Sequence, residues 1–172
     1  VALITLATSI GGPFFSVYLL KDLGFSPANW TIIILASSLS SFLFMPLWGK
    51  FADKFGNLKV MRMTGLFIPL VPMAWLAPAI IPMGQTTIMI FFFTSEFFSG
   101  FVWAGFNLSA VNFIYDAVTR QRIALCVAYF NLFNGVGVFV GATLGGVLSS
   151  LNFTFFGLTP ILASLQLLGQ LY

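Results

Sequence analysis

Charged residues are scarce in this chain of 172 residues. Lys, Arg, Asp and Glu together make up 6% of it, whereas a soluble globular domain carries about 25%. Hydrophobic residues make up 59%, and the mean hydropathy is +1.04. A water-soluble fold could not bury this much apolar surface, so composition excludes that class and predicts a lipid bilayer as solvent and partner.

Cysteine and histidine are also nearly absent. One Cys and no His exclude a disulfide framework and argue against a Zn, haem or Fe–S site, so we expect no metal and no cofactor. An enzyme would need His or clustered carboxylates, and the four acids are scattered, so we expect no enzyme. The sequence has no phosphate-binding Gly-Lys-Ser/Thr loop. The net charge of +3 does not predict nucleic-acid binding, because the basic residues lie at the ends of apolar runs.

Long apolar runs dominate what is present. A membrane-spanning helix needs about 20 apolar residues, and six runs approach or exceed this length. We expect an all-α, polytopic transmembrane bundle forming one membrane domain. The chain lacks an initiator Met, and both of its ends fall inside apolar runs, so we expect a fragment of a longer protein. The expected spans cover residues 1–20, 27–48, 58–77, 87–112, 126–148 and 155–172.

One short basic turn separates the second and third spans. Residues 49–62 contain four of the seven Lys and Arg residues. Gly49 and Gly56 suit the close backbone approach and positive φ of a tight turn. If successive spans cross the membrane in alternating directions, six of the seven cations lie on one side of the membrane and only Lys21 lies on the other. The positive-inside rule then predicts that loops 49–62 and 116–125 are cytoplasmic, in a multi-pass plasma (inner) membrane protein.

The spacing Gly-x-x-x-Asp-Lys-x-Gly-x-x-Lys at residues 49–59 resembles the signature loop of the major facilitator superfamily. The sequence departs from it at Asn57 and Leu58, where that family usually has basic residues. Three further segments resemble its seventh, tenth and eleventh helices: Pro13–Gly24, Trp103–Asn107 and Tyr129–Asn131.

The resemblance implies the C-terminal six-helix half of a twelve-helix transporter, with an N-terminal six-helix half as partner. It also implies secondary active transport of a small molecule by alternating access. The alternative is a non-transporting membrane receptor or assembly subunit on the same scaffold. The resemblance further implies a cytoplasmic gate that includes Gly49, Asp53, Lys54, Gly56 and Lys59.

Two acids in these cytoplasmic turns have alternative interpretations. Asp53 could meet a helix N-terminus across the two halves, or simply balance Lys50 and Lys54 in the turn. Asp116 could pair with Arg120 four residues later, either as a gate contact or as part of a solvated helix end.

Glu96 is the acid expected well inside the hydrocarbon. Such a residue costs about 2.5–3.5 kcal/mol on insertion scales, so it should face protein or water. Helical periodicity places Glu96, Gly100, Trp103 and Asn107 on one stripe. We hypothesise that Glu96 binds substrate or a coupling proton. The alternative is a hydrogen bond to a neighbouring helix.

Small and polar residues mark three other spans. Thr8 and Ser9 in the first span, and Asn131 and Asn134 in the fifth, could line a transport cavity or join helices. Packing is the favoured interpretation for Gly137, Gly141 and Gly145, and for the serines of the second span. These serines are Ser37, Ser38, Ser40 and Ser41.

Overall fold

The computed structural model describes residues 1–150, and within that range its regular structure is entirely helical. Among these residues, four helices are long and apolar enough to cross a membrane. They confirm the coarser prediction of an all-α membrane bundle. The expected sixth span, residues 155–172, lies outside the described residues. The four long helices cover Ala2–Asp22, Pro27–Phe55, Gln85–Ala117 and Arg120–Leu148.

The first two helices are joined by a short connection. Helix α1 (Ala2–Val17) continues into a π-helical turn, Tyr18–Asp22, and the chain then reverses through Gly24 at φ +65°. Helix α2 (Pro27–Phe55) begins where local signals predict: the Ser26 side chain accepts a hydrogen bond from the Asn29 amide at 3.3 Å, and proline occupies the first helical position.

The third expected span, residues 58–77, is divided into shorter helices. They are α3 (Asn57–Phe67), α4 (Leu70–Ala74) and α5 (Ala77–Ile80). Pro69 precedes α4, Pro72 lies within it, and Pro78 lies in the first turn of α5. Because proline cannot donate the backbone hydrogen bond of a helix interior, these residues weaken the span, which is interrupted at residues 68–69 and 75–76.

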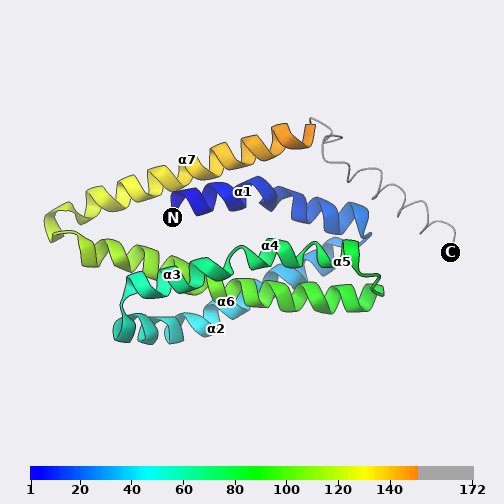
Figure 1. Cartoon of the computed structure of the whole chain (residues 1–172), viewed down its shortest axis with the longest axis horizontal. Helices are drawn as coiled ribbons and strands as arrows, with labels where there is room; N and C mark the ends of the chain where they lie inside the picture. Colours follow the sequence, from blue (N-terminus) through cyan, green and yellow to red (C-terminus); the bar gives the residue numbers. More distant parts are fainter. Residues whose placement is uncertain (151–172) are drawn as a thin grey trace.

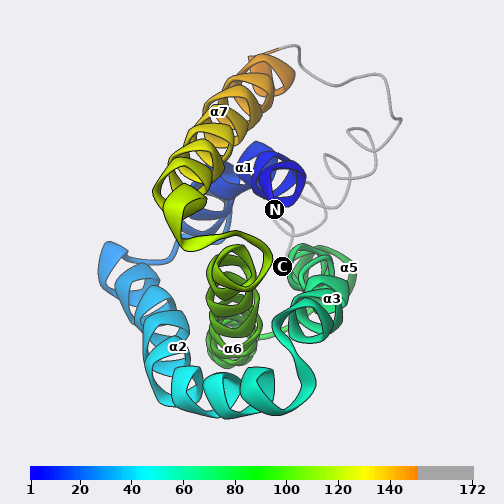
Figure 2. The same cartoon turned by 90° about the vertical axis from the view of Figure 1, so that its left-hand side faces the viewer.

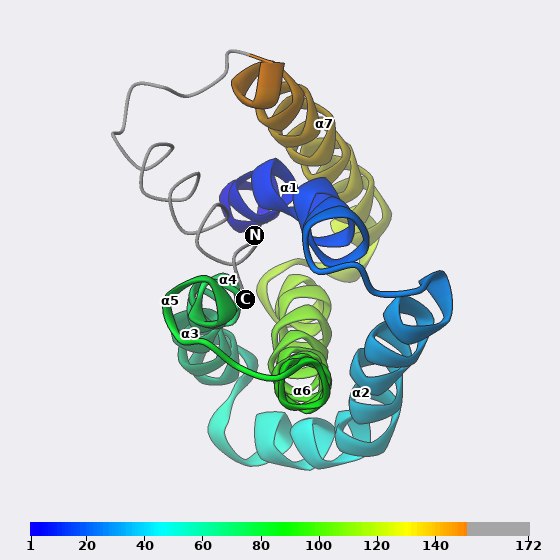
Figure 3. The ribbon, with the colours of Figure 1, turned by 90° about the vertical axis from the view of Figure 1, so that its right-hand side faces the viewer.

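Helix α6 (Gln85–Ala117) lies at the centre of the bundle, with α2 on one side and α3 on the other (Figures 2 and 3). Its contact with α2 is very close, because a Cβ added at Gly100 would collide with the backbone of Ser37. The Ser41 hydroxyl donates to the Gly100 carbonyl at 2.9 Å. Ser40 is fully buried. The packing role predicted for the second-span serines is therefore confirmed at these three positions.

Helices α1 and α7 (Ile123–Ser150) form a second closely packed pair (Figure 1). A Cβ added at Gly137, Gly141 or Gly145 would meet a backbone carbonyl oxygen of α1. These glycines are spaced four residues apart, so they lie along one side of α7 and allow the two backbones to approach. The packing interpretation of the three glycines is confirmed.

The two basic turns lie at the same end of the bundle, and the turn containing Lys21 lies at the other (Figure 1). Gly56 alone separates α2 from α3, and its φ of +88° confirms the positive-φ prediction. The prediction that Gly49 also forms part of the tight turn is wrong. Gly49 lies inside α2, no neighbouring atom comes within 4 Å of an added Cβ, and it takes no part in the turn itself.

Candidate functional site

A cavity of about 440 Å³ lies between α1, the α3–α4 segment and α6. Most of its wall is apolar, from side chains such as Ile4, Phe15 and Val71. Its polar lining comes from two helices, α1 and α6. A largely apolar pocket with a few convergent polar groups is typical of a small-molecule site. The polar and indole-bearing side chains on its wall are Thr8, Glu96, Ser99 and Trp103.

Glu96 is the acidic residue on this wall, and it is only partly exposed. The indole of Trp75, at the C-terminal end of α4, lies beside its carboxyl group. The Trp75 ring is 2% exposed, and its buried Nε1 has no partner with proper hydrogen-bond geometry among the described residues. An unsatisfied buried donor beside a carboxyl group leaves hydrogen-bonding capacity that a water, proton carrier or ligand could use.

Aromatic contacts hold the Trp75 ring in place. It stacks on Phe92 at 4.3 Å between ring centroids, lies 4.7 Å from Phe15 and meets the edge of Trp30 at 6.2 Å. These rings come from four different helices, so the indole is fixed by tertiary packing. Trp75 was not among the residues predicted from the sequence. The available signal was an indole in a span with almost no other polar group.

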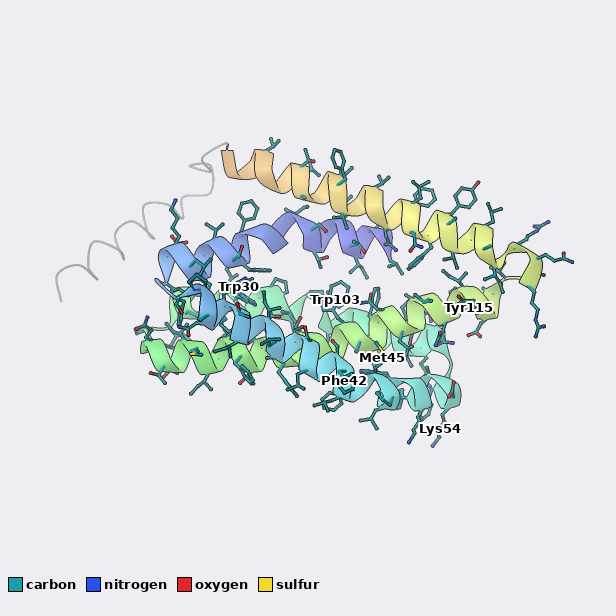
Figure 4. The ribbon with its side chains drawn as sticks, turned by 180° about the vertical axis from the view of Figure 1, so that it is seen from behind. Trp30, Phe42, Met45, Lys54, Trp103 and Tyr115 are labelled. Atoms are coloured by element: carbon teal, nitrogen blue, oxygen red, sulfur yellow. The ribbon has the colours of Figure 1, made fainter. Side chains whose placement is uncertain are left out.

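The predicted stripe on α6 is confirmed in part. Glu96 and Trp103 line the same cavity, and Figure 4 shows Trp103 midway along the bundle. Gly100 turns instead toward α2, and Asn107 is exposed. Gly100 lies about 40° around the helix from Glu96. Residues of the stripe therefore face different neighbouring helices.

On α1, Thr8 lines the cavity but Ser9 does not. The Thr8 hydroxyl bonds to carbonyls of its own helix, Ile4 at 3.0 Å and Thr5 at 3.1 Å. Ser9 lies against α7, where its Cβ would be 2.9 Å from a Cβ added at Gly141. Thr8 can therefore shape the cavity, while Ser9 contributes to helix packing.

The two asparagines of α7 have different surroundings. The Thr5 hydroxyl donates to Asn134 Oδ1 at 3.2 Å, which joins α1 to α7. Asn131 is exposed. Neither asparagine lines the Glu96 cavity. The structure thus supports helix joining for Asn134 and leaves Asn131 free to face another part of an intact protein.

At the end of the bundle that carries the basic turns, Asn57 Nδ2 donates to Asp116 Oδ2 at 2.6 Å. The predicted pair of Asp116 with Arg120 is wrong, because α6 ends at Ala117 and Val118 is extended. The four-residue spacing is therefore not helical. Asp53 is exposed, and Lys54 and Lys59 lie over the ring of Phe55.

Comparison with known proteins gives one match. The family model of the Major Facilitator Superfamily matches residues 1–172, the whole of the chain. No curated protein and no solved structure shows a significant match.

Proposed function

Because the chain belongs to the major facilitator superfamily, we propose that it is the C-terminal six-helix half of a secondary active transporter. It moves a small solute across the plasma (inner) membrane by alternating access, together with an N-terminal half. The four long apolar helices support membrane embedding. The segments resembling the seventh, tenth and eleventh helices support the assignment to the C-terminal half.

One observation carries the transport proposal: Glu96 lies on the wall of a cavity that three helical segments share. Holding an ionised carboxylate among apolar side chains is costly unless it is paired. The neighbouring group that the structure offers is a neutral indole, that of Trp75, and it makes no well-formed hydrogen bond to the carboxyl group. We propose that Glu96 exchanges a coupling proton, and that occupation of the cavity alters how α1 and α4 pack on α6.

Two exposed amide side chains are proposed to face the path of the substrate. Asn107 and Asn131 are polar side chains in predicted spans, and both are exposed. In hydrocarbon such amides would lack partners, so we propose that they face a water-filled passage between the two halves. Thr8 and Trp103 line the Glu96 cavity, while Ser9 and Asn134 join α1 to α7.

The basic turns form the proposed cytoplasmic gate. Asp53 is exposed and available for a contact in the other half, and the Asn57–Asp116 bond ties the start of α3 to the end of α6. Alternating access requires this end to open and close. The proposed gate includes Asp53, Lys54, Gly56, Lys59, Asp116 and Arg120, and Gly49 lies in the part of α2 that leads into it.

The experiment is carried out on the intact transporter in proteoliposomes with an imposed proton gradient. A panel of radiolabelled sugars, organic cations and carboxylates is offered, and uptake is measured with and without an uncoupler. We expect gradient-driven uptake of at least one solute, abolished by the uncoupler. Glu96→Gln should lose the proton-driven component. Asp22→Asn, which changes an acid in the turn that follows α1, should retain it. Unchanged proton-driven uptake by Glu96→Gln would refute the assignment.

A non-transporting receptor or assembly subunit is the second candidate. It would keep the same helices, and the tight glycine contacts of α7 with α1 suit a rigid scaffold. Absence of uptake for the whole panel, with the solute still binding to the detergent-purified protein, would favour this candidate.

A further inference from the structure

A basic and aromatic surface at the end of α2 lies outside the cavity of Glu96. It consists of Phe55, Lys54 and Lys59, and is called the α2-end patch below. The Nζ atoms of Lys54 and Lys59 lie 5.2 Å and 5.4 Å from the centroid of the Phe55 ring. All three side chains are exposed, Phe55 by 42%. We propose that the α2-end patch binds the phosphate headgroup of an anionic phospholipid.

The patch is anchored to the core by a row of aromatic rings. Phe55 lies 4.4 Å from Phe51 between centroids, and Phe51 meets the edge of Trp48 at 5.9 Å. Trp48 is 6% exposed, and its Nε1 donates to the Phe101 carbonyl at 2.8 Å. The ring that supports the two ammonium groups is therefore held by a buried residue of the same helix.

The length of α2 places the patch at the depth of lipid headgroups. Its 29 residues extend about 43 Å at about 1.5 Å each. This exceeds the hydrocarbon thickness of about 30 Å and matches the roughly 40–45 Å of a bilayer with its headgroups. A helix that starts at one interface, at its Ser26 cap, thus ends among the headgroups of the other. Lys and Arg side chains near the end of a span favour that layer.

The charge of this turn complements an anionic headgroup. Four cations and one acid, Asp53, lie within residues 49–62. Asp116, the acid of the neighbouring turn, already accepts the hydrogen bond from Asn57. No ion pair of Lys54 or Lys59 is found in the described part of the chain, so their ammonium groups remain able to bind phosphate oxygens.

The test is native mass spectrometry of the purified protein. The protein is first incubated in detergent with equal amounts of phosphatidylglycerol and phosphatidylcholine that have the same acyl chains, and is then released from the detergent in the spectrometer. The wild type should retain phosphatidylglycerol in preference to phosphatidylcholine. Lys54→Gln/Lys59→Gln should lower that preference by about 25-fold, because each of the two cations that contact the headgroup contributes a factor of about five.

The matched control is Arg120→Gln/Arg122→Gln. It removes two exposed cations from the same end of the bundle, but from a turn where no cation–ring contact is found among the described residues. It should keep most of the preference. The proposal is overturned if the lysine variant retains the wild-type preference, or if the arginine variant loses as much. Thermal unfolding of each variant checks that the substitutions leave the fold intact.

Discussion

Asn57 Nδ2 and Asp116 Oδ2 lie 2.6 Å apart, and their hydrogen bond joins the first residue of α3 to the last turn of α6. The residues are 59 positions apart in the sequence. The bond places an amide where the resembled signature loop usually has a basic residue. A neutral donor makes a weaker contact with a carboxylate than a cation does, so this end of the bundle is held together less strongly than a charged pair would hold it.

Replacing Asn57 by Ala should therefore lower stability only modestly. A hydrogen bond to a charged group contributes about 1.5–3 kcal/mol, and less at an exposed site. We expect a fall in Tm of a few degrees or less, measured by thermal unfolding in detergent. Asn57→Arg should have a Tm equal to or higher than that of the wild type, because arginine can form a charged pair with Asp116. A double-mutant cycle with Asp116→Ala checks that the effect belongs to this pair. A coupling free energy of zero would contradict the contact.

Gly141→Ala and Gly135→Ala should have opposite effects, although both lie in α7. At Gly141 an added Cβ would collide with the Leu6 carbonyl oxygen, whereas at Gly135 nothing lies within 4 Å. Alanine also favours a helix over glycine by about 1 kcal/mol. We expect Gly141→Ala to lower the Tm and Gly135→Ala to leave it unchanged or raise it. Equal changes in Tm for the two variants would show that α1 does not pack on Gly141.

Trp75→Phe should separate the hydrogen-bonding role of the indole from its packing role. Phenylalanine can maintain stacking on Phe92 while it removes an N–H that lacks a well-formed hydrogen bond. Since a buried unsatisfied donor is costly, we expect the Tm to stay the same or rise. Proton-driven uptake should nevertheless fall, because the group beside Glu96 has changed. Wild-type uptake by Trp75→Phe would remove the indole N–H from the mechanism. Trp75→Ala, which opens the aromatic wall, should lower the Tm.

Thr5→Val should weaken the contact between α1 and α7 without changing the shape of the side chain. It removes the hydroxyl that donates to Asn134 at 3.2 Å. Side-chain hydrogen bonds between transmembrane helices average about 0.6 kcal/mol, so we expect a small fall in Tm. Thr143→Val is the control, because its hydroxyl donates only within α7, to the Phe139 carbonyl at 2.8 Å. A larger fall in the control would contradict a role for Thr5 in joining the helices.

The sequence predicted features that depend on one residue and its near neighbours. The start of α2 follows from Ser26 and Pro27, and the reversal at Gly56 follows from the freedom of glycine at positive φ. The regular spacing of Gly137, Gly141 and Gly145 identified a packing face, because helical geometry alone puts these residues on one side.

Features that need two distant segments could not be predicted in the same way. Trp75 comes close to Glu96 because the chain turns at residues 68–69, before α4, and α4 then packs on α6. The observed partner of Asp116 is Asn57 and not the predicted Arg120, because α6 ends at Ala117. The position of a helix end depends on the turn that follows it. Periodicity placed Glu96 and Trp103 on one face, but it could not show which neighbour that face meets.

The most direct test of the account is the sidedness of three introduced cysteines in the intact protein. The native Cys126 is replaced first, together with any other cysteine. Lys54→Cys, Arg120→Cys and Lys21→Cys are then labelled with a membrane-impermeant maleimide in oriented vesicles. The turns that contain the first two positions lie at one end of the bundle, and the turn that contains Lys21 lies at the other (Figure 1). We expect positions 54 and 120 to react only from the cytoplasmic side and position 21 only from the opposite side. Labelling of positions 54 and 120 from opposite sides would contradict the account.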